Sequence, residues 1–537
     1  MEYILTYDIG TTGVKTCLFQ VDEQIKLIAG ATSGYHLYMM ENGGAEQDET
    51  EWWSSMCIST KKVLESTGVS PEKISGISFC SQMQGLVLVD KKGVPVHRPM
   101  SYMDQRATCE LKEGIAYGPQ IAGANIYKLL VSLKITGAVS SSVKDPMWKY
   151  KWIEKNEPEN FKRAYKWLDV KEYIISRCTG EFVMTEDTAY STLLYDTNKK
   201  EWSNRLCEMF GIQRDHLPRI IDTTDVVGPL LAKPAKELGL VPEIPVFGGG
   251  GDATLIGIGT GCVKVGQTHI YSGTSGWVST IVDHQMVDTS AMIAAIVGAQ
   301  KGRYNYFAEM ETAGKCLEWV KDHLALDEID VYLEKKDITQ DTRMGMEKVC
   351  RSLYEYMTEV VKRAKPGSGG VIFTPWLHGN RCPFEDNHAA GMFFNIGLTT
   401  GKTELIRAVL EGICYHMRWM LECQDKKIHT SDTIRFCGGG ALSDVTSQIL
   451  ADVIGRKIEV VENPQNVGAI GAAATAAVGC HLIESMDCLG KFIPVEKTFY
   501  PIAENKEIYD EIYEVFKALY PANKKNFNLI NSSKAVS

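Results

Sequence analysis

The chain has 537 residues, which is too long for one compact core, so we expect two or more domains. Its composition, with 44% hydrophobic and 23% charged residues, is typical of a soluble globular protein, and the net charge of −10 argues against nucleic acid as a partner. The sequence lacks a signal-peptide pattern and any apolar run of the roughly 18 residues that span a bilayer, so we expect a cytoplasmic protein that does not contact membranes. None of the 15 cysteines form C-x-x-C pairs, which indicates reduced thiols and no zinc site.

Two β-hairpins are the most informative predicted elements. Residues 3–19 contain an apolar run, a glycine turn and a second alternating run, and residues 268–282 repeat this pattern about half a chain later. The repetition predicts two similar halves. Between them, β-rich runs alternate with stretches of helical spacing, which predicts α/β domains. Helices are expected at residues 50–67, 161–178 and 403–424.

Composition also suggests the domain boundaries. A glycine run follows Pro245, so we expect a first domain at residues 1–245 and a second at residues 246–480. After about residue 480 the chain becomes charged and irregular. Residues 481–537 are therefore expected to form a peripheral C-terminal extension with one helix at about 505–519.

The first candidate for chemistry is the turn of the first hairpin. Asp8 ends a buried strand, and the turn Gly10–Gly13 follows it. Backbone N–H groups of such a turn can face nucleotide phosphates, the hydroxyls of Thr11 and Thr12 add donors, and the carboxylate can hold Mg²⁺ through water. Lys15 can contribute to phosphate binding or can be a solvated lysine at a strand edge. An ordinary hairpin turn is the alternative interpretation of the whole motif.

The second candidate is the run Gly248–Gly251 with Asp252 directly after it. Four glycines allow a ligand or another backbone to approach closely and can place a carboxylate in a cleft. Phosphoryl transfer requires a base that orients the attacking hydroxyl and accepts its proton, and one carboxylate is enough. A glycine-rich linker with a capping aspartate explains the same residues.

Two further glycine turns complete the pattern. Gly273 and Thr274 lie in the turn of the second hairpin and form a second candidate phosphate turn. An apolar strand runs into Gly439 and Gly440 before a helix start, where bare backbone could accept an adenosine. A tight strand-to-helix turn with Ser443 as the helix cap is the alternative there.

The order of these motifs resembles the architecture that sugar kinases share with actin and the heat-shock ATPases. Within it, the chain resembles the FGGY family of carbohydrate kinases over roughly residues 3–480, and most closely its xylulokinase branch. The segments that carry this resemblance are Glu46–Asp48 with Trp52 and Trp53, Pro146–Asn156, Trp376–Pro383 with Asn380 in place of the usual Glu, Arg407–Gly412 and Gly438–Ser443.

The resemblance implies a fold and a set of site residues. The expected fold is α/β, with two actin-like (ribonuclease H-like) ATPase domains and a cleft between them that binds ATP, Mg²⁺ and a small sugar. Asp252 falls on the catalytic base of the family and Asp8 on its Mg²⁺-associated acid. The implied nucleotide contacts are Thr11, Thr12, Lys15, Gly273, Thr274, Gly439, Gly440 and Ser443. The implied sugar contacts are Gln82, Met83, Gln84, Asp104 and Arg106.

Three departures from the xylulokinase pattern lie on the sugar side. Gln84 replaces a His, Tyr102 and Met103 replace Trp and Asn, and Ala253 replaces the Asn after the catalytic Asp. We therefore expect kinase chemistry, with D-xylulose converted to D-xylulose 5-phosphate as the first hypothesis. A kinase of another ketose, a polyol or a gluconate-type aldonate, a non-catalytic ATP-binding regulator and a plain ATPase are the alternatives. The family also suggests a homodimer.

Overall fold

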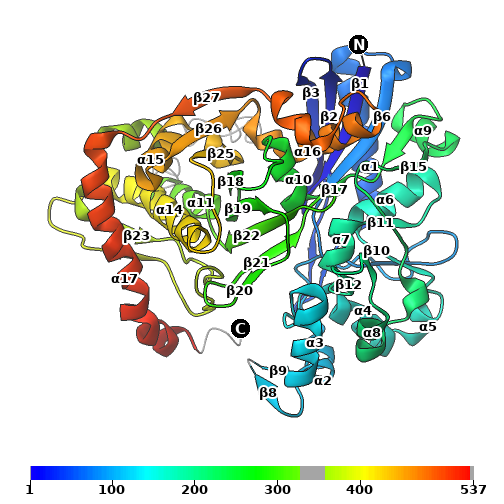
Figure 1. The fold of residues 1–537 in the computed structure, drawn as a ribbon, viewed down its shortest axis with the longest axis horizontal. Helices are drawn as coiled ribbons and strands as arrows, with labels where there is room; N and C mark the ends of the chain where they lie inside the picture. The colour runs from blue at the N-terminus through cyan, green and yellow to red at the C-terminus, as the bar shows by residue number, and fades with distance from the viewer. Residues whose placement is uncertain (1, 122, 327–356, 533–537) are drawn as a thin grey trace, which may run out of the picture.

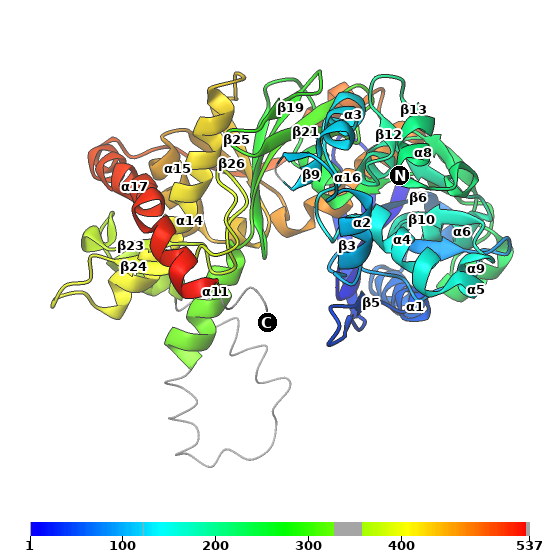
Figure 2. The ribbon, with the colours of Figure 1, turned by 90° about the horizontal axis from the view of Figure 1, so that it is seen from below.

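The structure, a computed structural model, describes residues 2–121, 123–326 and 357–532. Two α/β halves lie side by side, each with a central sheet and helices against it (Figures 1 and 2). The predicted two-domain α/β architecture is confirmed. Within the described ranges, no helix combines the length and the apolar character that crossing a membrane requires.

The N-terminal half is built on one mixed sheet. Its strands are, in spatial order, β15 (Val226–Pro229), β16 (Pro245–Phe247), β6 (Ile74–Ser81), β1 (Glu2–Ile9), β2 (Gly13–Val21) and β3 (Ile25–Gly34). β1, β2 and β3 are antiparallel, β6 runs parallel to β1, and the short β17 (Gly250–Gly251) pairs with the end of β6. The carboxyl ends of β1, β6 and β17 therefore meet at one edge of the sheet.

The C-terminal sheet repeats this topology. Its strands are β20 (Val287–Asp288), β21 (Ile293–Val297), β22 (Tyr304–Met310), β19 (Gly276–Val282), β18 (Thr268–Ser272), β25 (Thr433–Cys437), β26 (Lys457–Val461) and β27 (Val495–Phe499). Five of them, β22-β19-β18-β25-β26, have the order and directions of β3-β2-β1-β6-β16. Both predicted hairpins are confirmed, and so is the prediction of two similar halves.

Helix α1 (Glu49–Thr67) packs against the N-terminal sheet and confirms the first predicted helix. It begins after Asp48, whose carboxylate accepts a hydrogen bond from the Thr50 N–H, and it ends at Gly68 in the left-handed region. Trp52 on its inner face is fully buried in the core.

The second predicted helix, at residues 161–178, is only partly correct. The structure has the strand β10 (Lys166–Leu168), which pairs with β7 (Val87–Val89), and then helix α6 (Val170–Thr179). Asp169 separates the two, because its carboxylate accepts a hydrogen bond from the first helical N–H at 2.8 Å. Neighbouring apolar residues in such a short run fit the period of a strand as well as that of a helix.

Two helices join the halves. α10 (Asp252–Gly259) and α16 (Val467–Gly479) pack against each other between the two sheets (Figure 1). A Cβ at Gly259 or at Gly471 would lie 1.8 or 2.2 Å from a carbonyl oxygen of the other helix. Glycine is therefore required where the two backbones touch. Side chains of both helices share one hydrophobic core with residues from each sheet.

The segment after residue 480 is part of the C-terminal core and is not peripheral. β27 is the last strand of the sheet, and helix α17 (Lys506–Asn531) is longer than predicted. Tyr513 and Phe516 of α17 pack into the core that also contains α14 (Lys402–Asp425), the third predicted helix. Residues 533–537 of the predicted extension lie outside the described residues. The division between the two domains at residue 245 stays a prediction.

Candidate active site

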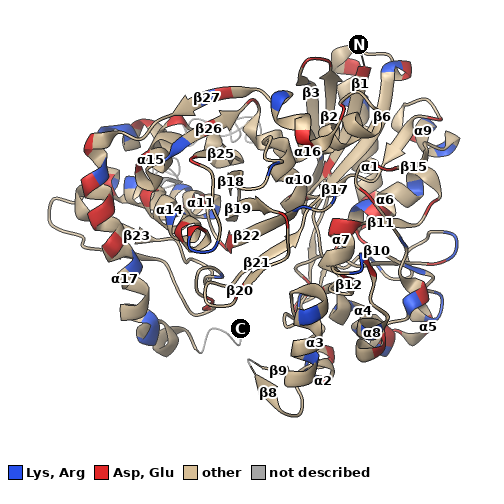
Figure 3. Ribbon diagram, viewed as in Figure 1, with Lys and Arg blue, Asp and Glu red and all other residues tan. Residues whose placement is uncertain are grey.

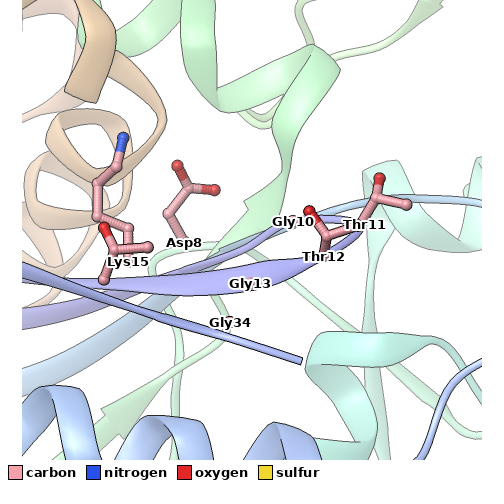
Figure 4. A pocket seen from close by; sticks show the side chains of 8 residues that line it. Asp8, Gly10, Thr11, Thr12, Gly13, Lys15 and Gly34 are labelled. Atoms are coloured by element: carbon pink, nitrogen blue, oxygen red, sulfur yellow. The ribbon is translucent and has the colours of Figure 1, made fainter. Parts of the chain in front are cut away.

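A pocket of about 300 Å³ lies at the end of β1, around the predicted first phosphate turn (Figure 4). It is lined by Asp8, Gly10, Thr11, Thr12, Gly13, Lys15, Thr32 and Gly34. Asp8 and Lys15 are partners across the hairpin, so their side chains rise from the same face of the sheet. The Lys15 Nζ donates to the carbonyl oxygen of Gln465 at 2.9 Å. This hydrogen bond links the turn to the C-terminal half just before α16.

The catalytic candidate Asp252 lies at the same edge of the sheet. Asp8 is in register with Cys80 on β6, and Cys80 is in register with Gly250 on β17. Asp252 follows two residues later as the first residue of α10, and its Oδ1 accepts a hydrogen bond from the Ala253 N–H at 2.7 Å. The strand ends therefore bring together two carboxylates that are more than 240 residues apart in the sequence.

The surroundings of these carboxylates make them poor acids. Burial, together with smaller contributions from the negative charges of Asp8 and Glu309, raises the pKa of Asp252 to about 7. Burial also raises the pKa of Asp8, while the nearby Lys15 ammonium opposes that shift. A carboxylate with a pKa near 7 can accept a proton at neutral pH far more readily than an ordinary aspartate.

The predicted second phosphate turn and the predicted nucleoside turn are in contact. β18 and β25 are parallel, so the turns that follow them meet at one edge of the C-terminal sheet. Gly438 has φ +87°, and a Cβ there would lie 2.5 Å from the Ser272 carbonyl oxygen; a Cβ at Gly440 would lie 2.7 Å from the Ser272 Oγ. Gly439 has open space around it. Gly273 accepts a hydrogen bond from the Gly314 N–H at 2.7 Å, and Thr274 next to it is exposed.

Ser443 caps the following helix. Its Oγ accepts a hydrogen bond from the Thr446 N–H at 3.3 Å, at the first turn of α15 (Asp444–Ile454). This is the capping geometry that the sequence left open as an alternative. A contact between Ser443 and a nucleoside stays a prediction.

On the predicted sugar side, hydrogen bonds connect Gln82 to the predicted first phosphate turn. Its Nε2 donates to the Gln47 Oε1 at 2.9 Å, and the Gln47 Nε2 donates to the Thr11 carbonyl oxygen at 2.6 Å. The Gln82 Oε1 is buried and has no hydrogen-bond partner in the part of the chain that the structure describes. Such an acceptor suits a hydroxyl donor from a ligand. Met83 lies beside the catalytic candidate, because a Cβ at Gly251 would be 2.1 Å from its Sδ.

Gln84 has φ +64°, which non-glycine residues rarely adopt. Its carbonyl oxygen accepts a hydrogen bond at 2.8 Å from the Nζ of Lys149, a fully buried lysine whose pKa burial lowers to about 8. The next residue, Gly85, donates its N–H to the Asp169 Oδ1 at 3.0 Å. The loop that carries Gln82–Gln84 is therefore fixed by buried charged groups.

Asp104 and Arg106 form a buried ion pair. The Arg106 Nη2 lies 2.8 Å from the Asp104 Oδ2 and 2.8 Å from the Glu46 Oε1, and the guanidinium stacks on the Trp152 ring at 4.5 Å. Asp104 also accepts a hydrogen bond from the Ala45 N–H at 2.8 Å. Both residues have partners within the protein, so a direct sugar contact for either of them stays a prediction.

Two residues that the sequence did not suggest lie next to the carboxylates. Tyr271 stacks on Trp277 with ring centroids 4.0 Å apart, and the charges of Asp252 and Asp8 are among the causes that raise its pKa, after burial. Glu309 is paired with Arg381 at 2.7 Å. Tyr271 lies on β18, within the second predicted hairpin, although that pattern does not mark it as a site residue. Glu309 lies on β22, where no local motif marks it, and the pairing of β22 with β19 places it at the site.

Comparison with known proteins identifies the family of the chain. Residues 3–259 match the N-terminal domain, and residues 269–480 the C-terminal domain, of the FGGY family of carbohydrate kinases. The chain is 28% identical to a xylulose kinase of Bacillus subtilis over 529 residues, covering 98% of each chain. It is also 28% identical to a gluconokinase of Bacillus subtilis over 522 residues, covering 96% of this chain and 95% of the relative.

A solved structure shows the same fold. The ligand-bound xylulose kinase from Lactobacillus acidophilus superposes with a TM-score of 0.83 at 24% identity, covering 99% of this chain and all of the other. The two family matches together cover most of the chain, in the order in which the two halves occur. The chain therefore belongs to the FGGY family of carbohydrate kinases, and it is a phosphotransferase with an alcohol group as acceptor.

Proposed function

We propose that this kinase transfers the γ-phosphoryl group of ATP to a hydroxyl of D-xylulose, with Asp252 as the base. The observation that carries the catalytic part is the position of Asp252: it follows β17 directly at the carboxyl edge of the N-terminal sheet, where β1 ends with Asp8, and burial raises its pKa to about 7. The sugar hydroxyl would donate its proton to the Asp252 carboxylate as its oxygen attacks the γ-phosphorus. The backbone N–H groups of the two turns at Gly10–Gly13 and Gly273–Thr274 are the proposed phosphate contacts.

The residues present fit a Mg²⁺ ion that arrives with the nucleotide. Mg²⁺ in kinases is commonly held by one or two carboxylates together with substrate phosphates and waters. Asp8 supplies one carboxylate at the wall of the pocket, and the described residues include no cluster of three His, Cys, Asp or Glu that could hold a metal alone. When bound there, the ion would neutralise charge on the transferring phosphoryl group.

The substrate assignment rests on similarity and on the sugar-side residues. Relatives of equal identity include a xylulose kinase and a gluconokinase, so a gluconate-type aldonate is the second candidate substrate. Gln84, Met103 and Ala253 depart from the xylulokinase pattern at the expected sugar contacts. The homodimer and the cytoplasmic location stay predictions as well.

The test is a coupled ADP-release assay with Mg²⁺-ATP and a panel of ketopentoses, ketohexoses, aldonates, polyols and glycerol. We expect turnover with D-xylulose that Asp252→Asn abolishes. Turnover with gluconate and with no other panel member would show that the substrate is an aldonate and not D-xylulose, and would leave the role of Asp252 as the base unchanged. ATP hydrolysis that no panel member stimulates, or an active Asp252→Asn variant, would contradict the proposal.

A further inference from the structure

A buried carboxylate on another element holds the turn that presents Asp252. Asp187 belongs to the short helix α7 (Glu186–Ser191) of the N-terminal half and is fully buried. Its Oδ2 accepts a hydrogen bond from the Gly251 N–H at 2.8 Å and from the Thr254 hydroxyl at 2.6 Å. These donors lie one residue before and two residues after Asp252, so both sides of the catalytic candidate are anchored to one carboxylate.

The other oxygen of Asp187 connects to a buried cation. The Thr185 hydroxyl donates to the Asp187 Oδ1 at 2.5 Å, and the Lys171 Nζ donates to the Thr185 Oγ1 at 2.7 Å. Lys171 is fully buried and is also paired with Glu172. A continuous path of hydrogen bonds therefore runs from Lys171 through Thr185 and Asp187 to the turn. In a water-poor interior, bonds to charged groups of this kind are strong and directional.

The Asp187 carboxylate is not buried in order to cap its own helix. The residue before the first turn of α7 is Thr185, whose side chain caps no helical N–H and donates to Asp187 instead. The carboxylate is directed to a segment more than 60 residues later in the chain. A Cβ at Gly250 would lie only 3.0 Å from the Asp187 Oδ2, so glycine there allows the close approach of the two elements.

We propose that Asp187 is a positioning residue for the phosphoryl transfer, acting by fixing the backbone on both sides of Asp252. The inference rests on the proposed role of Asp252 as the base. A base must lie within hydrogen-bond reach of the attacking hydroxyl, and a displacement of about 1 Å can cost about 10²-fold in rate. Removing Asp187 would release the Gly251 N–H and the Thr254 hydroxyl together.

The kinetic test uses the full chain and the panel substrate with the highest turnover. We expect Asp187→Ala to lower kcat by about 10²-fold while the KM for ATP changes by less than about threefold, because ATP contacts are not altered. Thr254→Val, which leaves the Gly251 contact in place, should lower kcat by about tenfold. In the Asp252→Asn background, Asp187→Ala should add no further loss, since residues that act as a unit are not additive.

Asp196→Ala provides a matched control. Asp196 is also a buried aspartate of the N-terminal half, and its Oδ1 accepts hydrogen bonds from the N–H groups of Asn198 and Lys199, at 3.0 Å each. This variant should lose stability without the loss of kcat. If Asp196→Ala and Asp187→Ala lower Tm and kcat by similar amounts, the role of Asp187 is structural and the proposal is wrong.

Amide hydrogen exchange gives a measurement that needs no sugar. In Asp187→Ala, exchange in the segment at residues 248–255 should be faster than in the wild type and in Asp196→Ala. Normal kcat and normal exchange in Asp187→Ala, with Asp252→Asn inactive, would overturn this inference alone. An active Asp252→Asn variant would overturn the proposed function instead. If Asp187→Ala does not fold, kcat and amide hydrogen exchange of Thr254→Val test the positioning role of Asp187 in its place.

Discussion

At the scale of single residues, the carboxylate of Asp252 is held where its charged form is costly. Its pKa is about 7 in the folded protein against an ordinary value of 3.8, with burial as the main cause. The folded state therefore binds a proton that the unfolded state has released over this interval, and stability falls as pH rises from 3.8 to about 7. The residue favours catalysis at the expense of stability, as is common at active sites.

Asp252→Asn should therefore stabilise the protein while it removes activity. At about pH 8 the variant should be more stable than the wild type by on the order of 1–4 kcal/mol, and at about pH 4 the difference should vanish. Urea unfolding of both proteins at both pH values measures this difference in stability. Asp288→Asn is the control of opposite sign, since a hydrogen bond from Ser290 is the main cause that lowers the pKa of Asp288. That variant should lose stability at about pH 8. If Asp252→Asn is less stable than the wild type at that pH, the raised pKa of Asp252 in the folded protein is contradicted.

The same pKa predicts the acid limb of the rate profile. kcat/KM should rise about tenfold per pH unit up to about pH 7 and then level off, because only the ionised Asp252 can accept the proton. Glu309→Gln should move this limb to lower pH, since the charge of Glu309 helps to raise the pKa. Steady-state kinetics between about pH 5 and pH 9 measure both profiles. A profile that is flat below pH 7 would exclude Asp252 as the titrating base.

At the scale of elements, the glycine turns position the site, and they could be predicted because each is contiguous in sequence. Asp8 with its turn and Asp252 with its glycine run occur as local motifs. Asp187 and Glu309 lie on a short helix and on a strand with no such motif, and only tertiary pairing places them near the site. The strand at Lys166–Leu168 differs from the predicted helix for the same reason: its partner β7 is nearly 80 residues away in the sequence.

The contact between α10 and α16 makes Gly471 sensitive to substitution. A Cβ there would lie 2.2 Å from the Leu255 carbonyl oxygen, and both helices are packed into one core with residues from the two sheets. Gly471→Ala should cost about 3 kcal/mol or more, or prevent folding. Gly439→Ala is the matched control, because no atom lies within 4 Å of a Cβ there, and its stability should change by less than about 0.5 kcal/mol. Equal stabilities of the two variants in urea unfolding would contradict the close crossing.

At the scale of the whole molecule, two sheets with one topology are connected by two helices that share a core with both. Acidic and basic residues are interspersed over both halves (Figure 3). The family match ends at residue 480, yet the second half continues through β27 and α17. The compositional change at residue 480 marks a more polar outer surface, because α17 presents charged residues outward and aromatic residues inward.

The C-terminal segment is therefore expected to be essential for folding. Arg407 on α14 donates to the Tyr509 hydroxyl at 2.8 Å, and Arg418 pairs with Asp510 at 2.7 Å, so α17 covers the core with both polar and apolar contacts. A chain that ends at residue 480 should lack a cooperative thermal transition, because it exposes this core. Phe516→Ala in the full chain should cost about 3–5 kcal/mol, while Leu529→Ala, with 82% of the residue exposed, should change stability by less than about 0.5 kcal/mol. A truncated chain that unfolds cooperatively near the Tm of the full chain would show instead that the C-terminal half is complete at residue 480.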